Sequence, residues 1–171
     1  KQGGFEIHTD NIEGALELYD YCFKIGKEFN LKPGTPNHPE RIEGGLLSYG
    51  SDMDIFNNPF ECGFDKYVDL NSDIVFLGKE NLKKIKEKGI KKKLMGVKIE
   101  SKSIDVSQGI QMLDLKENEV GQLRSAAYSP KFNKVVGIAM IEKNFWAISK
   151  KFKINIDGNF VSGETCNLPI L

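Results

Sequence analysis

The sequence predicts an α+β protein in which the helices come first and the strands come last. Apolar residues recur at helical spacing in several segments before residue 91. From residue 92 onward, short apolar segments separated by turn residues follow one another at intervals of about ten residues. We therefore expect two domains, residues 1–91 and residues 92–171, and the second is predicted to be a small β-barrel or β-sandwich.

The first segment predicts a short strand followed by an amphipathic helix. Phe5–His8 alternates apolar and polar side chains after a glycine pair, which is typical of a strand. Asp10 and Glu13 have the spacing of a capping box at a helix start. The helix is predicted to run to about Glu28, because these residues recur at helical spacing: Ile12, Ala15, Leu16, Tyr19, Phe23 and Gly26.

A second helix is predicted over Glu40–Gly50. Prolines exclude a helix before it, and Gly50 offers a left-handed stop after it. Ile42, Leu46 and Tyr49 fall on one face of this helix. The pair Gly44–Gly45 would cost the helix about 1–2 kcal/mol relative to two alanines, so we expect another backbone or a ligand to approach closely there.

A basic segment follows. Asp65–Leu70 is predicted to be a strand or extended, and Phe76–Lys88 is predicted to form a further helix. The lysine-rich run 83–93 is typical of a solvated helix face and the loop after it. Docking of an acidic partner is the alternative, whereas nucleic-acid binding is disfavoured because no aromatic residue is interleaved with the lysines.

The last eighty or so residues predict six strands separated by turns. Asp157–Asn159 has the composition of a tight hairpin turn between the last two strands. The six predicted strands are Leu94–Ile99, Gly109–Leu115, Glu119–Ser125, Val135–Ile141, Lys151–Ile156 and Phe160–Asn167.

Composition excludes several classes of protein. The formal net charge of zero argues against a general polyanion or nucleic-acid binder. No apolar run approaches the ~20 residues that a membrane span needs, and no signal peptide is visible, so we expect a cytoplasmic protein. The three cysteines lack metal-ligand spacing and are expected to be reduced thiols, with no metal bound. A catalytic cysteine partnered by His8 or His38 is an alternative on residue type alone.

Several motifs resemble a known family. The run RIEGGLLSYGSDMD, followed by NPFECGFDKYVDL and later by GQLRSAAYSP, is similar to the signature of the glycine-cleavage T-protein family of tetrahydrofolate-dependent enzymes. The form LKPGTPN…ERIEGGLLSYG most resembles the dimethylsulfoniopropionate demethylase branch of that family. This resemblance implies the C-terminal part of a folate-binding α+β domain, followed by a six-stranded antiparallel β-barrel.

The resemblance also implies tetrahydrofolate as cofactor and four candidate binding residues. Glu6 matches a carboxylate that binds the pterin ring, for which two adjacent N–H donors suit a charged acceptor. His8 lies two residues on, hence on the same strand face. Arg41 and Tyr128 complete the set, although Tyr128 could equally cap the barrel. The family's catalytic residues are expected outside this chain, so we assign none here.

The reaction implied is methyl transfer from a dimethylated sulfonium to N5 of tetrahydrofolate. Asn37–Glu40 stands where the glycine-cleavage branch has an Ala-Arg-Asp run, which favours a small-molecule methyl donor over an aminomethylated lipoyl carrier. The alternatives are a glycine-cleavage aminomethyltransferase, a sarcosine-type demethylase partner, or a non-catalytic folate-binding assembly or repair protein. That last group would carry a K-G-C-Y-x-G-Q-E motif, which this sequence lacks.

The chain begins at Lys1 on a segment that resembles the middle of a domain. The resemblance therefore predicts an N-terminal portion of the same enzyme as a partner. We expect the isolated chain to be inactive or nearly so. A homo-oligomer that buries the exposed core face against a second copy is the other expectation. The lysine run could alternatively hold a polyglutamylated folate tail.

Overall fold

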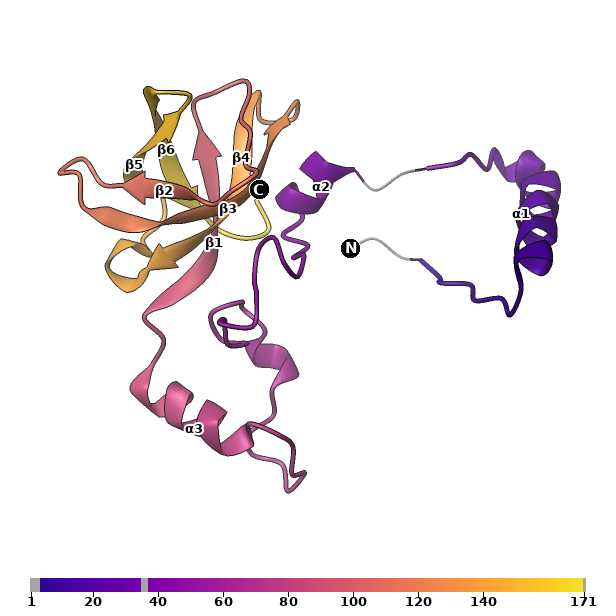
Figure 1. Ribbon diagram of the computed structural model, residues 1–171, viewed down its shortest axis with the longest axis horizontal. Coiled ribbons are helices and arrows are strands. Elements are labelled where there is room, and N and C mark those ends of the chain that lie inside the picture. The colour runs from indigo at the N-terminus through magenta and orange to yellow at the C-terminus, as the bar shows by residue number, and fades with distance from the viewer. Residues whose placement is uncertain (1–3, 35–36, 171) are drawn as a thin grey trace. The chain divides into compact units, whose positions relative to one another are not determined.

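Six antiparallel strands close into a barrel (Figure 1), in the spatial order β1-β4-β3-β2-β5-β6. The computed structural model describes residues 4–34 and 37–170. The chain divides into two compact units, residues 1–36 and residues 37–171. The barrel confirms the predicted α+β class and decides against a sandwich. Its strands are β1 Lys92–Ile99, β2 Ile110–Leu113, β3 Glu119–Ser129, β4 Lys134–Glu142, β5 Lys151–Ile156 and β6 Asn159–Cys166.

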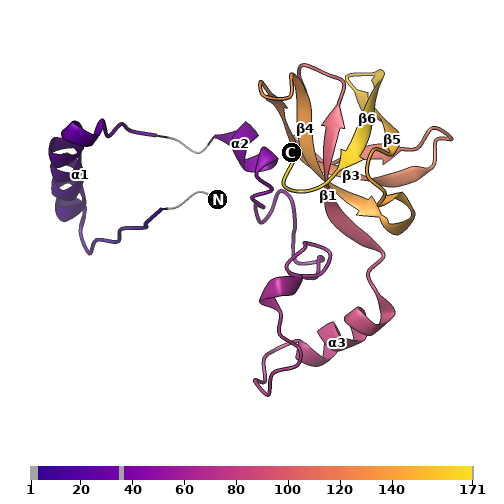
Figure 2. The same cartoon turned by 180° about the vertical axis from the view of Figure 1, so that it is seen from behind.

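The hairpin between β5 and β6 forms as the sequence predicts. Asp157 and Gly158 have φ values of +50° and +85°, which suit a two-residue turn whose twist matches the strands. Figure 2 shows this hairpin from behind, in orange and yellow, where it completes the wall of the barrel. Ile154 pairs with Val161 and Phe152 with Gly163 across the hairpin.

Strand β4 is buried on both of its faces. Successive side chains of a strand point to opposite faces, so alternate residues belong to different apolar clusters. Residues of the inward set pack in the barrel interior, whereas the outward set packs against helix α2 (His38–Glu43) and the C-terminal segment. The inward residues are Val135, Ala139 and Ile141, and the outward residues are Val136, Ile138 and Met140.

A β-bulge in β3 changes which side chains face outward. Leu123 pairs with Ala139 and Ser125 pairs with Ile138, so Arg124 is the extra residue of the bulged strand. Leu123 and Ala126 both belong to the interior cluster, although they are an odd number of residues apart. The bulge therefore allows Ser125 to face the outside of the barrel, toward helix α2.

Helix α2 is shorter than the sequence predicts. It begins after Asn37, whose side chain accepts a hydrogen bond from the Glu40 N–H at 3.3 Å, and it ends at Glu43 rather than at Gly50. The Leu46 N–H donates to the carbonyl of Arg41, and Gly45 has φ +65°, as in a Schellman motif. A left-handed residue ends a helix, so conformation explains glycine at position 45. The crowding that we expected there is ordinary contact, since a Cβ on Gly45 would lie 3.4 Å from Leu168.

The segment between α2 and the barrel departs from the predictions in two places. Asp65–Tyr67 forms a short 3-10 helix (η2) in place of the predicted extended segment, closed by the Val68 N–H on the Asp65 carbonyl. Helix α3, Lys79–Lys88, begins three residues later than predicted, because Gly78 precedes it in a left-handed conformation. Both views in Figure 1 and Figure 2 show α3 standing off the end of the barrel. A further 3-10 helix, η3, spans Lys143–Phe145.

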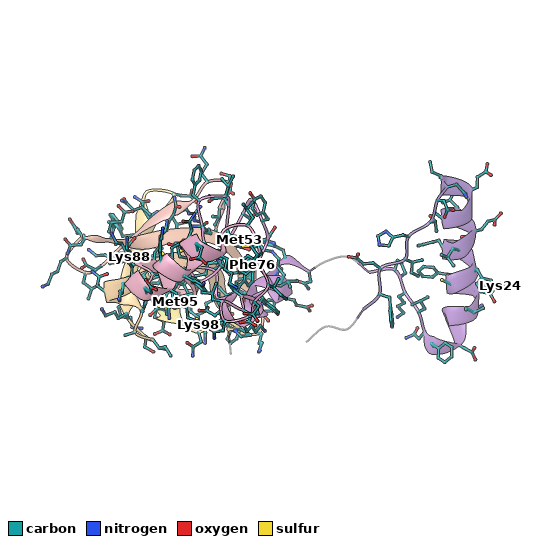
Figure 3. The ribbon with its side chains drawn as sticks, turned by 90° about the horizontal axis from the view of Figure 1, so that it is seen from below. Lys24, Met53, Phe76, Lys88, Met95 and Lys98 are labelled. Atoms are coloured by element: carbon teal, nitrogen blue, oxygen red, sulfur yellow. The ribbon has the colours of Figure 1, made fainter. Side chains whose placement is uncertain are left out.

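The unit of residues 1–36 contains helix α1, Ile12–Gly26, followed by a 3-10 turn, η1, Lys27–Phe29. The N-cap is Asn11, not the predicted Asp10, and its side chain accepts from the Gly14 N–H at 2.7 Å. The predicted strand Phe5–His8 is wrong: residues 4–9 form no strand, and the described residues 4–34 of this unit contain no second strand to pair with them. Figure 3 labels Lys24, which projects from α1 into solvent.

We predict that Gly163→Ala strains the barrel because of one aromatic ring. A Cβ at position 163 would lie 2.3 Å from Cζ of Phe152, which is fully buried. Overpacking of this kind lowers the free energy of unfolding by about 1–3 kcal/mol. Urea denaturation of Gly163→Ala, Phe152→Leu and the double variant measures the coupling.

Because Phe152→Leu removes the two closest atoms, Cζ and Cε2, and leaves the Lys98 carbonyl oxygen at 2.9 Å, the double variant should be more stable than the sum of the two single changes predicts. Strictly additive losses would show that the ring does not require glycine at position 163.

Candidate functional site

Arg41 joins the end of α2 to the following loop and to the barrel. Its Nη1 donates to Asp52 Oδ2 at 2.7 Å and to the Leu46 carbonyl at 3.0 Å, and its Nη2 donates to Ser125 Oγ at 3.0 Å. The Asp52 side chain is completely buried, and Oδ2 also accepts from the Ser48 N–H at 2.7 Å. One guanidinium thus fixes three segments of the chain in a single geometry.

Glu43 makes a second connection, two residues further along the helix. The Ser129 hydroxyl donates to Glu43 Oε1 at 2.5 Å, and the Ile170 N–H donates to the Glu43 carbonyl at 2.7 Å. Ser129 is fully buried and also accepts from the Phe132 N–H at 3.2 Å. Helix α2 is therefore held between strand β3 and the C-terminal segment.

The loop after α2 places a third set of polar groups beside the β3 bulge. Arg124 Nη1 lies 3.8 Å from Asp54 Oδ2, and the Asp54 N–H donates to Asn57 Oδ1 at 3.1 Å. Three buried polar atoms here have no hydrogen-bond partner among the described residues: Asp52 Oδ1, Asn57 Nδ2 and Arg124 Nε. Each such atom lowers the stability of the folded state by about 1–3 kcal/mol. The packing around this loop must therefore compensate for the loss.

Asp52, Asp54 and Ser125 were not predicted from the sequence as parts of this site. The partner of Ser125 lies far away in the chain, since 84 residues separate it from Arg41, and Asp52 lies 11 residues from Arg41 beyond the end of α2. The signal that could have found Asp52 is its position in the same short run as Arg41, R-I-E…Y-G-x-D, since a buried carboxylate needs a cationic partner.

Glu6 and His8, the first two predicted cofactor residues, lie in the unit of residues 1–36. His8 Nε2 and Glu6 Oε2 are 3.6 Å apart, and the two side chains are 86% and 89% exposed. Their carboxylate and imidazole groups are thus accessible and face one another, as expected for residues two apart in extended chain.

Arg41 and Tyr128, the other two predicted residues, lie in the unit of residues 37–171. The terminal nitrogens of Arg41 are engaged within the chain, as described above. The Tyr128 hydroxyl donates to Asn133 Oδ1 at 2.8 Å, and the ammonium group of Lys102 lies 5.4 Å from the ring centroid. The structure gives both residues a role within the fold, and their contact with a cofactor stays a prediction.

A cavity of about 790 Å³ opens beside helix α2. Met95, labelled in Figure 3, forms part of its wall. Two cysteines also line it. Burial raises the pKa of the Cys62 thiol from 9.0 to about 11, and the charges of Glu61 and Asp54 act in the same direction. Burial likewise raises the pKa of Cys166 to about 11. A nucleophilic cysteine needs a lowered pKa, so both thiols serve as apolar lining.

Among residues 4–34 and 37–170, no group of three or more His, Cys, Asp and Glu side chains is placed to hold a metal ion. Within the same described part of the chain, no helix has the length and apolar character needed to cross a membrane.

Comparison with protein families gives two matches along the chain. Residues 1–72 match the GCVT N-terminal domain, and residues 92–171 match the glycine cleavage T-protein C-terminal barrel domain. The second match begins at the first residue of β1.

Individual relatives carry two different names. The chain is 37% identical over 147 residues to dimethylsulfoniopropionate demethylase DmdA of Ruegeria pomeroyi, covering 86% of this chain and 40% of that protein. It is 31% identical over 170 residues to an aminomethyltransferase of Thermosipho melanesiensis, covering 98% of this chain and 44% of that protein. The chain thus spans less than half the length of these relatives.

A solved structure has the same fold. The glycine cleavage system aminomethyltransferase T of Bartonella henselae matches with a TM-score of 0.70 and 19% identity, over 78% of this chain and 37% of that chain. At this identity the likeness concerns the fold alone.

We predict that Asp52→Ala lowers the free energy of unfolding by about 3 kcal/mol, because it leaves the Arg41 charge without its buried partner. Arg41→Met combined with Asp52→Ala should cost less than the sum of the single changes, by about 1–3 kcal/mol. Urea denaturation followed by circular dichroism measures all three variants.

The matched control is Glu80→Ala, which removes an exposed pair with Lys83. It should leave the denaturation midpoint unchanged, since exposed pairs contribute little. If the changes at positions 41 and 52 are additive, the two side chains do not depend on each other.

We further predict that Cys62 and Cys166 react slowly with iodoacetamide at pH 8. A pKa raised from 9.0 to about 11 lowers the thiolate fraction about 100-fold relative to the unfolded chain. Peptide mapping after timed alkylation measures each site, with the urea-unfolded chain as control.

The raised pKa of the two thiols also determines how the free energy of unfolding changes with pH. The two neutral thiols contribute fully to stability below pH 9, and this contribution is lost as pH rises from 9 to 11, because the unfolded state ionises first. Equal alkylation rates in folded and unfolded protein at pH 8 would contradict the assignment.

Proposed function

Because the chain belongs to the glycine-cleavage T-protein family, we propose that it is part of a tetrahydrofolate-dependent one-carbon transferase. The observation that carries this proposal is the ordered match of both family domains, at residues 1–72 and 92–171. Relatives with two different names support the same general chemistry. We retain the division into a folate-binding portion, residues 1–91, and a barrel domain, residues 92–171, as part of the proposal.

Within this family we favour a dimethylsulfoniopropionate demethylase. The identity of 37% to the demethylase exceeds the 31% to the aminomethyltransferase of Thermosipho melanesiensis. The segment Asn37–Glu40 supports the same choice, because Asn37 and Pro39 serve there to start helix α2 and no arginine precedes Arg41 in this helix. The exposed His38 does not replace a permanent positive charge at neutral pH.

Tetrahydrofolate fits one of the candidate residues particularly well. The Glu6 carboxylate is 89% exposed, and its contact with His8 Nε2 has the long distance of 3.6 Å. Both oxygens can therefore accept the adjacent N–H donors of a pterin edge, and such charge-assisted bonds are strong. Arg41 has less capacity to bind a cofactor, because its terminal nitrogens already donate to Asp52, Leu46 and Ser125.

In this proposal the chain binds and orients rather than breaks bonds. Bound tetrahydrofolate supplies the nitrogen that accepts the one-carbon unit. A sulfonium is already a good leaving group, so the protein has mainly to align donor and acceptor, which can supply several kcal/mol of the barrier. Glu6 holds the pterin edge, Arg41 and Glu43 fix helix α2 on the barrel, and the catalytic groups belong to the remainder of the enzyme.

The partner that we propose is an N-terminal portion like that of the longer relatives. Helix α1 leaves Ile12, Leu16 and Tyr19 exposed at helical spacing, by 79%, 62% and 54%. Apolar stripes of this kind mark surfaces that another part of a protein covers. A second copy of the chain is the alternative occupant. We place the complete enzyme in the cytoplasm, in line with its reduced cysteines.

A glycine-cleavage aminomethyltransferase is the second candidate, because several relatives carry that name at 28–32% identity. A sarcosine-type demethylase partner stays a further alternative. A non-catalytic folate-binding assembly or repair protein is the least supported, since Cys62 lies in an N-P-F-E-C-G context and its pKa is raised by burial.

We predict that the product of the complete reading frame converts tetrahydrofolate and dimethylsulfoniopropionate into 5-methyltetrahydrofolate and methylthiopropionate. Methyl signals followed by NMR measure the conversion. Glu6→Ala should weaken tetrahydrofolate binding about 10-fold, because it removes two charge-assisted hydrogen bonds, whereas Glu13→Ala on α1 should leave it unchanged.

Turnover with an aminomethylated lipoyl carrier and none with the sulfonium would assign the enzyme to the glycine-cleavage reaction instead. Folate binding without turnover of either donor would favour the non-catalytic alternative. Turnover by the 171-residue chain alone would show that the catalytic groups lie within it.

A further inference from the structure

The cavity beside helix α2 has the size and lining of a small-molecule site. Its volume of about 790 Å³ lies within the range of ~300–1,000 Å³ that such sites occupy. Four separate segments build its walls: the turn 44–47, the segment 60–67, the start of β1 from residue 90 to 95, and the C-terminal residues 166–169. Trp146 completes the lining.

Most of this lining is apolar. Leu94 and Leu168 contribute to it, together with Cys62 and Cys166, and all four belong to the same apolar cluster. Trp146 has its indole N–H already engaged, because Nε1 donates to the Ile141 carbonyl at 2.8 Å. This bond fixes the indole ring in the wall of the cavity.

Two lysines give the cavity a positive charge. The ammonium group of Lys93 lies 4.7 Å from the centroid of the Trp146 ring, and that of Lys66 lies 4.8 Å from the Tyr67 ring. Neither ammonium has a carboxylate partner in the described part of the chain. Asp65 is the one carboxylate among the lining residues, so the charges leave an excess cation.

From this combination we propose that the cavity binds a small aromatic carboxylate. The flat apolar body lies against the apolar wall beside Trp146, and the carboxylate accepts hydrogen bonds from Lys93 and Lys66. A cation that rests on an aromatic face keeps its three N–H donors available for an anion. A neutral ligand would leave these donors unused, and a small anion such as acetate would leave the apolar wall uncovered.

The single tryptophan of the chain makes this proposal directly measurable. Trp146 fluorescence of the 171-residue chain is followed during titration with benzoate, benzamide and acetate. Benzoate should quench the signal with a Kd of about 1 mM, as expected for a ligand of its size. Benzamide and acetate should each bind at least about 5-fold more weakly, since benzamide lacks the negative charge and acetate lacks the aromatic ring.

Two lysine variants locate the site, and a third lysine is the control. Lys93→Met and Lys66→Met keep an apolar stem but remove the charge, and each should weaken benzoate about 3-fold or more. Lys84→Met on the exposed face of α3 should bind benzoate as the parent chain does. Lys66 lies on an exposed segment, so its variant stays informative even if Lys93→Met unfolds the barrel.

Added tetrahydrofolate identifies the source of the natural ligand. Displacement of benzoate would mean that tetrahydrofolate enters the cavity with its benzoyl ring and a glutamate carboxylate, whereas unchanged benzoate binding would mean a separate ligand; both results uphold the site. Equal quenching by benzoate and benzamide, or parent-like binding in both lysine variants, would overturn the proposal. None of these readouts requires methyl transfer, so their outcome is independent of the proposed reaction.

Discussion

The outward apolar row of strand β4 is the constraint on which the rest of this structure depends. Val136, Ile138 and Met140 would face water if the barrel stood alone, and burying such side chains contributes about 1.5–3 kcal/mol each. Ile42 of helix α2 and Ile170 of the C-terminal segment cover them. Every polar connection of the candidate site follows from this packing, because it brings the end of α2 against β3.

The polar connections specify geometry more than they add stability. Desolvation offsets much of the attraction in a buried pair such as Arg41 and Asp52, whereas removal of one partner is costly. Helix α2 therefore has one acceptable position on the barrel. The bulge at Arg124 belongs to the same arrangement, because it turns Ser125 outward to meet the guanidinium. A strand without the extra residue would direct that hydroxyl into the interior.

The strands of the barrel could be predicted from the sequence because their information is local, whereas the choice of barrel over sandwich came from the family resemblance. Alternation along each strand and the Asp157–Gly158 turn are readable within a few residues. Helix α2 was predicted too long, since the apolar spacing of Leu46 and Tyr49 continues past the point where Gly45 turns left-handed. The strand at Phe5–His8 was wrong because a strand is decided by its pairing partner. The role of Arg41 within the fold could not be predicted, since its partners Asp52 and Ser125 are 11 and 84 residues away.

The long separation between helix α2 and the strands that cover it also affects synthesis on the ribosome. Ile42 leaves the ribosome well before Val136 and Ile138, which lie more than 90 positions later in the chain. At translation rates of about 5–20 residues per second, this apolar side chain remains for roughly 5–20 s without its neighbours in β4. Throughout that interval the nascent chain presents an uncovered apolar segment, which makes this stretch the natural place for a chaperone to hold the protein until the barrel is complete.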